Sequence, residues 1–282
     1  ETIQETEEVG KARLAFLRGD RTNEGTAGYK FRLRGSVLGD VWHSAPTFYG
    51  KPSKNWADTA VFGDGDLYSD FKEEHASRDG VVYVGSNDGM LHAFDAKSGE
   101  EILAYVPGNL YSSTIYDGYH QLTDPNFEHT SIYVDGTPYV GDAYIRTRSI
   151  TSESWRTVLI GTEADGGRGL FALDVTNPSG FSESTPKNVV LWEFSNADDD
   201  HLGKTFSRPS VALLNNNRWA VITGNGPEDT AVDWAAGDAQ LFIIYLDGGI
   251  DGSWTKGEDY LRITTTVGKK TDRNGLFTPA LI

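Results

Sequence analysis

The chain of 282 residues contains no cysteine, so it can form no disulfide, no thiolate zinc site and no haem attachment through sulfur. It also lacks an apolar run long enough to cross a membrane, which predicts a protein that is not embedded in a bilayer. Basic residues are scarce beside acidic ones: 25 Lys and Arg stand against 41 Asp and Glu, a formal net charge of −16. Such a charge disfavours nucleic acid and anionic lipid as partners, because both are themselves negative.

Common signatures of catalysis are missing as well. The sequence holds no nucleophile elbow, no P-loop and no dinucleotide fingerprint between a strand and a helix. The six histidines show no metal-ligand spacing, and His92 is predicted to be a strand residue beside a turn rather than a ligand. No signal peptide is visible at Glu1, so export would imply a processed or truncated chain.

Glycine, by contrast, is abundant, and much of it stands in tight turns between short strands. Three apolar, β-branched and aromatic runs of strand type follow one another at residues 81–85, 91–95 and 102–106. Between the first two, Asn87-Asp88-Gly89 is a hairpin signal, because Gly and Asn tolerate the positive φ of such turns. Three short antiparallel strands with tight turns make most of one propeller blade.

This pattern repeats along the chain. An apolar strand ending in Gly, a polar turn and a second strand ending in Asp recur at residues 157–174 and 219–247. A Pro-containing segment precedes each copy, and the four prolines are Pro46, Pro138, Pro209 and Pro279. Their spacing of roughly 70–90 residues suits blades with loop insertions. We therefore predict an all-β fold, a modified β-propeller with long inserted loops, as a single domain or propeller fragment over residues 1–282.

An N-terminal helix is predicted within residues 1–20, where apolar residues recur at helical spacing, acids come early and basic residues late. Gly19 is the expected terminator. Arg18, Gly19 and Asp20 together spell the tripeptide known as an integrin ligand. The alternative, which we favour, is a helix end followed by a turn that engages Asp20, because a three-residue match is frequent by chance.

An acidic insertion is predicted between residues 56 and 79. Its carboxylates Asp64, Asp66 and Asp70 could wrap a hard cation such as calcium, which takes six to eight oxygen ligands. A solvated acidic loop is the alternative and the one we favour, because the aromatic Tyr68 stands where an EF-hand loop supplies a further ligand.

The last residues, 280–282, are expected to belong to a strand. An unfinished blade leaves an open sheet edge, so we expect that the native protein continues or that this chain is a fragment.

Several short runs occur in a fixed order: LRGDR at 17–21, SVLGD at 36–40, SAP at 44–46, VYVGSNDGMLHAF at 82–94, YVDGTP at 133–138 and VGDA at 140–143. In this order they resemble the C-terminal propeller domain of the PilY/PilC family, the bacterial type IV pilus biogenesis and pilus-tip adhesin proteins. The resemblance covers nearly the whole chain. The run NDGMLHAF is its most specific part.

The resemblance implies a modified β-propeller on an exported protein of the bacterial outer membrane, pilus tip or cell surface. It implies that the protein supports pilus assembly against retraction. It also implies that the protein contributes to twitching motility and to adhesion. The implied partners are pilin or minor pilins at the pilus tip, with host-cell receptors as further candidates. Some members bind calcium in an Asp-rich loop after the strand that matches residues 278–282, so those ligands correspond to no residue here. Calcium remains a candidate cofactor only through Asp64, Asp66 and Asp70.

A quinoprotein-like dehydrogenase propeller is the alternative function. Residues 93–100 resemble the blade motif of those enzymes, but Leu103 stands where a Trp would follow, and the second copy at residues 172–176 loses its Gly. The motif chiefly joins one blade to the next, so it argues for quinoprotein-like blades more than for catalysis. We therefore expect no quinone and no enzymatic activity.

Overall fold

Three four-stranded antiparallel sheets follow one another along the part of the chain that the computed structural model describes, residues 6–62, 66–112, 117–227 and 237–281. The first sheet contains β1 (Thr47–Tyr49), β2 (Val81–Gly85), β3 (Leu91–Asp95) and β4 (Glu101–Tyr105). The second contains β5 (Tyr139–Ile145), β6 (Ser154–Thr162), β7 (Gly169–Asp174) and β8 (Val190–Ser195). The third contains β9 (Ser210–Leu213), β10 (Trp219–Gly224), β11 (Asp238–Tyr245) and β12 (Tyr260–Gly268).

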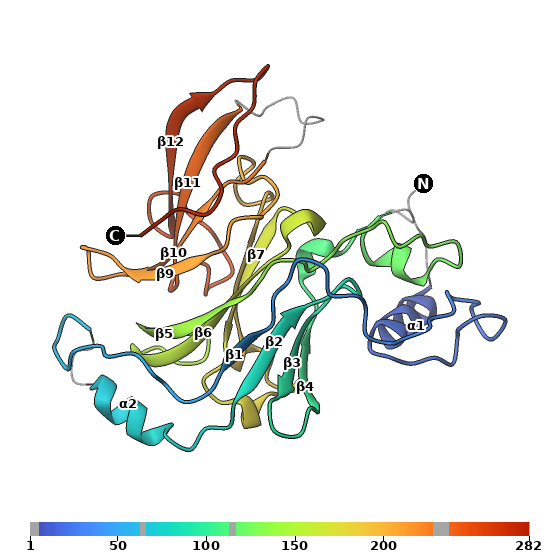
Figure 1. The fold of residues 1–282 in the computed structure, drawn as a ribbon, viewed down its shortest axis with the longest axis horizontal. Coiled ribbons are helices and arrows are strands. Elements are labelled where there is room, and N and C mark those ends of the chain that lie inside the picture. Colours follow the sequence, from blue (N-terminus) through green and yellow to red (C-terminus); the bar gives the residue numbers. More distant parts are fainter. Residues whose placement is uncertain (1–5, 63–65, 113–116, 228–236, 282) are drawn as a thin grey trace.

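Each sheet is a propeller blade, with its strands in chain order in space. The first strands of the sheets approach one another, β1 against β5 and β5 against β9, while β4, β8 and β12 lie at the outer edges. Figure 1 shows the three sheets fanning out from this side. Pro46, Pro138 and Pro209 each stand directly before the first strand of a blade, as predicted. The strand expected at residues 280–282 does not form at residues 280 and 281, because no neighbouring strand pairs with them; residue 282 lies outside the described residues. The predicted modified β-propeller is confirmed.

The hairpin of the first blade also forms as expected. Gly89 has a φ of 97°, and Ser86 N–H donates to the Met90 carbonyl at 3.0 Å to close the turn between β2 and β3. The third predicted strand begins and ends one residue earlier than expected. Such small shifts at element ends are ordinary, because hydrogen bonding rather than residue type sets the boundary.

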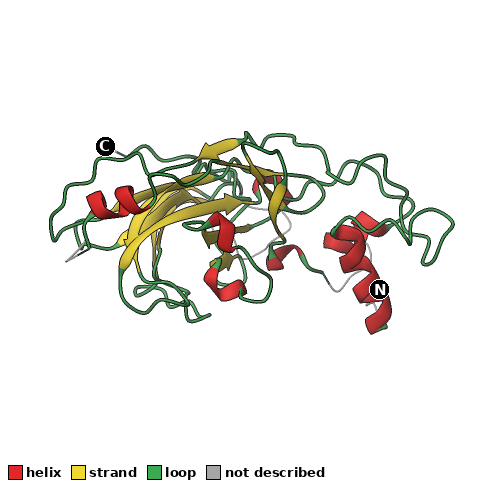
Figure 2. Cartoon of the chain, turned by 90° about the horizontal axis from the view of Figure 1, so that it is seen from below, coloured by secondary structure: helices red, strands yellow, loops and turns green. Residues whose placement is uncertain are grey.

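The α-helices lie outside the sheets. Helix α1 (Glu7–Leu17) begins at the cap residue Thr6 and ends before Gly19, whose φ is 98°; residues 1–5 of the predicted helix lie outside the described residues. Helix α2 (Tyr68–Glu74) was not predicted and forms inside the acidic insertion. In Figure 2 α1 lies at one end of the molecule, apart from the strands.

Short 3-10 helices occupy several connections. They are η1 (Gly108–Leu110), η2 (Gly118–Thr123), η3 (Ala164–Gly166), η4 (Pro178–Gly180) and η5 (Pro186–Asn188). Among the described residues, no helix is both long and apolar enough to span a membrane.

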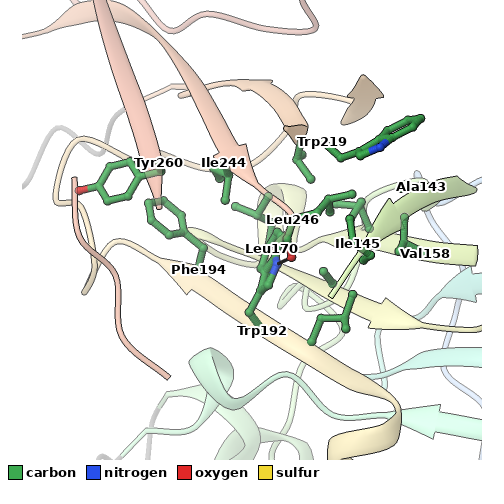
Figure 3. Close-up of a cluster of buried hydrophobic side chains, with 14 of the residues drawn as sticks. Ala143, Ile145, Val158, Leu170, Trp192, Phe194, Trp219, Ile244, Leu246 and Tyr260 are labelled. Carbon is green, nitrogen blue, oxygen red and sulfur yellow. Dashed lines mark hydrogen bonds between the residues drawn. The ribbon is translucent and has the colours of Figure 1, made fainter. Parts of the chain in front are cut away.

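Two hydrophobic clusters hold the blades together. The larger lies between the second and third blades and combines aliphatic side chains with aromatic ones that include Trp155, Trp192, Phe194 and Trp219. Figure 3 shows Trp192 and Phe194 beside Leu246 and Tyr260 from the third blade. The other cluster lies between the first two blades and takes in Phe16 and Leu17 of α1. Burying one face of every sheet in this way is what positions the outer edges and loops that carry the candidate sites.

Candidate functional site

The tripeptide Arg18, Gly19 and Asp20 lies exposed at the C-terminal end of α1. Arg18 forms an ion pair with Glu183, which lies between β7 and β8 of the second blade. The Asp20 carboxylate accepts a hydrogen bond from Thr22 N–H at 2.7 Å, and this bond holds the pKa of Asp20 below its ordinary value. Asp20 is thus engaged in a local turn, as the favoured interpretation predicted.

A buried ion pair fixes the backbone under this tripeptide. Arg34 Nε lies 2.7 Å from Glu24 Oε1, and both side chains are almost fully buried. The same guanidinium donates to the carbonyls of Phe16 at 2.7 Å and Asp20 at 2.9 Å, and it stacks 3.6 Å from the centre of the Phe16 ring. The end of α1 and the loop after it are therefore a rigid base rather than a free loop tip.

The three carboxylates of the acidic insertion are only partly visible. Asp64 lies outside the described residues, so the structure does not test whether the three converge on a cation. Asp66 binds the second blade: its carbonyl accepts from the Trp155 indole at 3.0 Å and its Oδ2 from Trp155 N–H at 3.4 Å. Asp70 lies in the first turn of α2, where the helix dipole favours an acid.

Another acidic group follows β8. Within the described residues, Asp199, Asp200 and His201 are the one set of three whose ligand atoms lie close enough for a metal ion. Asp199 already accepts a hydrogen bond from the Tyr260 hydroxyl at 2.9 Å and pairs with Arg262 of β12. A cation would have to displace Arg262, so this group is a tie between the second and third blades.

His92 is a buried strand residue between two carboxylates. Its Nε2 lies 3.0 Å from Asp88 Oδ1 in the hairpin turn, and its Nδ1 lies 3.0 Å from Glu101 Oε2 at the start of β4. Burial alone would lower the pKa of His92, but the hydrogen bonds and charges of Asp88 and then Glu101 outweigh it and raise the pKa. His92 thus ties the turn to the outer strand.

A second pair of carboxylates lies where the first two blades meet. Glu163, at the end of β6, is almost fully buried and accepts a hydrogen bond from Asn109 of η1 at 2.8 Å. Burial, together with the nearby charge of Glu193, raises the pKa of Glu163 to about 7. Glu193 of β8 accepts hydrogen bonds from the Tyr105 hydroxyl and from Gly108 N–H. Neither glutamate was singled out in the sequence.

A groove of about 740 Å³ lies beside β4. It is bounded by α1, by residues 37–38, by β4 and by residues 181–190 of the second blade. Its walls are mostly apolar, and the Arg18–Glu183 pair and the Asp88–His92–Glu101 group contribute its polar atoms. Because segments far apart in the sequence form it, no local pattern in the sequence could have revealed it.

These features define a class of protein: a β-propeller domain with a groove beside one outer edge strand and with loops anchored by hydrogen bonds and ion pairs. The blade motif resembling quinoproteins serves the architecture, since Asp95 Oδ1 accepts hydrogen bonds from Lys97 N–H at 3.0 Å and Ser98 N–H at 2.7 Å within its own turn.

Comparison with known proteins agrees with this class. A family model described as the PilY1 beta-propeller domain matches residues 38–282. The chain therefore belongs to the PilY1 β-propeller family. The crystal structure of the Pseudomonas aeruginosa PilY1 C-terminal domain superimposes with a TM-score of 0.60 at 35% identity, covering 83% of this chain and 40% of that one.

Curated relatives give the same answer. A type IV pilus biogenesis factor PilY1 homolog of Xylella fastidiosa is 41% identical over 233 residues, which are 83% of this chain and 17% of the relative. The type IV pilus biogenesis factor PilY1 of P. aeruginosa strain PAK is 41% identical over 242 residues, 85% of this chain and 19% of the relative. The chain thus spans less than a fifth of the length of these two relatives.

Proposed function

We propose that this chain acts in type IV pilus biogenesis, as a non-enzymatic binding domain of an exported, surface-associated protein. The family match across residues 38–282, with relatives named pilus biogenesis factors, carries the proposal. In it the domain supports pilus assembly against retraction, and through that twitching motility and adhesion. Its partners are pilin or minor pilins at the pilus tip.

A genetic replacement tests this role. In the source bacterium, deleting the coding region for residues 38–282 should abolish surface pili and twitching, with the remainder of the protein followed by immunoblot. Removing pilus retraction in the same strain should restore pili, because the proposed role is to oppose retraction. Wild-type pili and twitching in the deletion strain would overturn the proposal.

Adhesion in this proposal does not depend on the tripeptide Arg18-Gly19-Asp20. Arg18 is paired with Glu183 and Asp20 with Thr22, so the two charged groups are engaged within the chain. We expect Asp20→Glu to leave adhesion of the purified chain to integrin-bearing cells unchanged. Loss of adhesion by a folded Asp20→Glu variant would assign that role to the tripeptide, with host-cell receptors as partners.

Two measurements on the purified chain test the enzymatic alternative and the calcium hypothesis. An absorbance scan of the purified chain should lack a quinone band, and a bound quinone would favour the dehydrogenase alternative. Micromolar calcium should leave the melting temperature unchanged if Asp64, Asp66 and Asp70 form a solvated loop. A rise of several degrees that Asp66→Asn abolishes would instead establish calcium as a cofactor, since a ligand stabilises the state that binds it.

A further inference from the structure

The outer edge of the first blade is open. Strand β4 pairs with β3 on one side, and Figure 1 shows its other side turned toward α1. Among the described residues, no backbone or side-chain group outside the blade hydrogen-bonds to the backbone of Glu101–Tyr105. An edge strand of this kind presents unpaired N–H and C=O groups, which are a template for a further strand.

The other two outer edges differ from this one. At β8 the Trp254 indole donates to the Glu193 carbonyl at 2.9 Å and so covers part of the edge. Strand β12 is interrupted at Thr266, whose φ is 60°, and a register irregularity lies opposite it near Asp238. Bends of this kind are ways in which proteins prevent edge pairing. Among the described residues, β4 has no such cover and no residue of positive φ, although its pairing with β3 has one register irregularity, between Ala93 and Phe94, near the start of the strand.

The groove beside β4 adds apolar walls to this open edge. Leu14 of α1 and Leu38 stand on its walls and are 42% and 40% exposed, while Phe181 and Val189 of the second blade also line it. Residues 102–105 of the strand and Val106 after it are all apolar or aromatic and half-buried. A strand added here would gain backbone hydrogen bonds and pockets for alternate side chains.

The charge of the groove indicates what such a strand should carry. Its lining holds the permanent cation Arg18 and the histidine His92. Against them stand the carboxylates of Asp88, Glu101 and Glu183, so negative charge is in excess. The excess is greatest at the start of β4, where the Glu101 side chain is 47% exposed and the exposed Glu100 precedes it. A basic side chain at that end would be attracted, and an acidic one repelled.

We propose that β4 accepts an antiparallel β-strand from a partner protein. The strand has apolar residues at alternate positions and a Lys or Arg near its C-terminal end, where it meets Glu100 and Glu101. This deepens the binding role proposed above and rests on it only for the source of the strand. Its test uses the purified chain with synthetic peptides, so it can fail while pilus assembly still depends on the domain.

The probe is a capped, fluorescently labelled peptide that alternates valine and threonine and ends in two lysines. Fluorescence anisotropy should show saturable binding to the full chain, and hydrogen exchange should slow at residues 101–106. A peptide ending in two glutamates should bind at least tenfold more weakly. A third peptide, with its alternate backbone nitrogens methylated, should not bind, because it cannot extend the ladder of hydrogen bonds.

A charge exchange on the chain completes the design. Glu101→Lys should weaken binding of the lysine peptide at least tenfold and strengthen binding of the glutamate peptide. The matched control Glu258→Lys, at an exposed acid before β12, should change the affinity of neither peptide. Equal binding of the methylated peptide, protection elsewhere than at residues 101–106, or pairing of β4 with a second copy of the chain would each overturn the proposal. The hydrogen-exchange measurement uses the wild-type chain, so it tests the proposal even if Glu101→Lys misfolds.

Discussion

The two junctions between blades both bury a hydrophobic cluster, but they differ in the contacts that complete it. Between the first and second blades, buried Asp142 of β5 accepts hydrogen bonds from the hydroxyls of Tyr49 at 2.8 Å, Tyr68 at 2.7 Å and Thr157 at 2.7 Å. Between the second and third blades, aromatic rings pack edge to face, with Phe194 4.9 Å from both Trp254 and Tyr260. The first junction thus adds a buried, hydrogen-bonded carboxylate to its apolar packing, and the second adds a set of packed aromatic rings.

Different kinds of substitution should therefore destabilise the two junctions. A buried carboxylate is stable only while every donor and acceptor around it is satisfied, so small chemical changes matter more than volume. An aromatic junction tolerates small changes of polarity at its rim but not the loss of a ring, which leaves a cavity. The first junction also holds Glu163, whose raised pKa should make its stability respond to pH near neutrality.

The largest effect is expected from Phe194→Ala at the aromatic junction. Phe194 is fully buried, and the variant should lower the free energy of unfolding by about 4 kcal/mol and the melting temperature by about 10 °C. Differential scanning calorimetry measures both. Phe48→Ala is the matched control, because Phe48 is 64% exposed and its loss should cost less than about 1 kcal/mol. If the two variants lose the same free energy of unfolding, burial of Phe194 at this junction does not stabilise the fold as argued.

The next effect is a pH dependence at the first junction. The folded-state pKa of Glu163 is raised to about 7 from 4.5, so the folded chain holds this proton more tightly than the unfolded chain. The resulting stability is fully present below pH 4.5 and is lost as the pH rises through 7, a change of about 3 kcal/mol. Glu163→Gln should remove this dependence and leave the chain more stable than wild type at pH 8.

Urea unfolding at pH 4.5, 6, 7 and 8 measures the dependence. Glu258→Gln, at an exposed glutamate, is the control and should follow the wild-type curve. If Glu163→Gln also follows the wild-type curve, Glu163 is ionised throughout this range and the assignment is wrong.

A smaller loss of stability is expected when a single atom of the Asp142 side chain is changed. Asp142→Asn replaces an acceptor oxygen by a donor that faces hydroxyl groups, and should cost about 2 kcal/mol. Tyr49→Phe removes one donor and should cost about 1 kcal/mol, and the two losses should not add, because they share one hydrogen bond. Chemical denaturation of both single variants and the double variant gives the coupling; strict additivity would mean that Tyr49 does not contribute through Asp142.

Part of the fold around these junctions could be predicted from the sequence. Strand periodicity, Gly-containing turns and the prolines at strand starts located the blades, because these signals depend on local backbone geometry. Helix α2 was missed, since its seven residues are stabilised by burying Tyr68 and Phe71 against the second blade rather than by helix propensity. Asp142 and Glu163 were also missed, although an acid at the middle or end of an apolar strand is a signal for a buried polar network.

The candidate sites were predictable to different degrees. Gly19 and the engagement of Asp20 followed from helix-end chemistry, which is local. The groove beside β4 and the pairing of Arg18 with Glu183 join residues 165 positions apart and depend on how the blades pack. No periodicity in one sequence carries that information.

The smallest effect concerns a hydrogen bond that recurs between blades. Ala45 N–H donates to Thr137 Oγ1 at 2.9 Å ahead of the first blade, and Arg208 N–H donates to Thr278 Oγ1 at 2.9 Å ahead of the third. We expect Thr137→Val to cost about 1 kcal/mol, because Thr137 is half-buried. Thr278→Val should cost only a few tenths of that, because Thr278 is exposed and water can replace the lost acceptor. Urea midpoints of variants with equal slopes would separate the two losses of stability, and a larger loss at Thr278 would show that this bond is buried in solution.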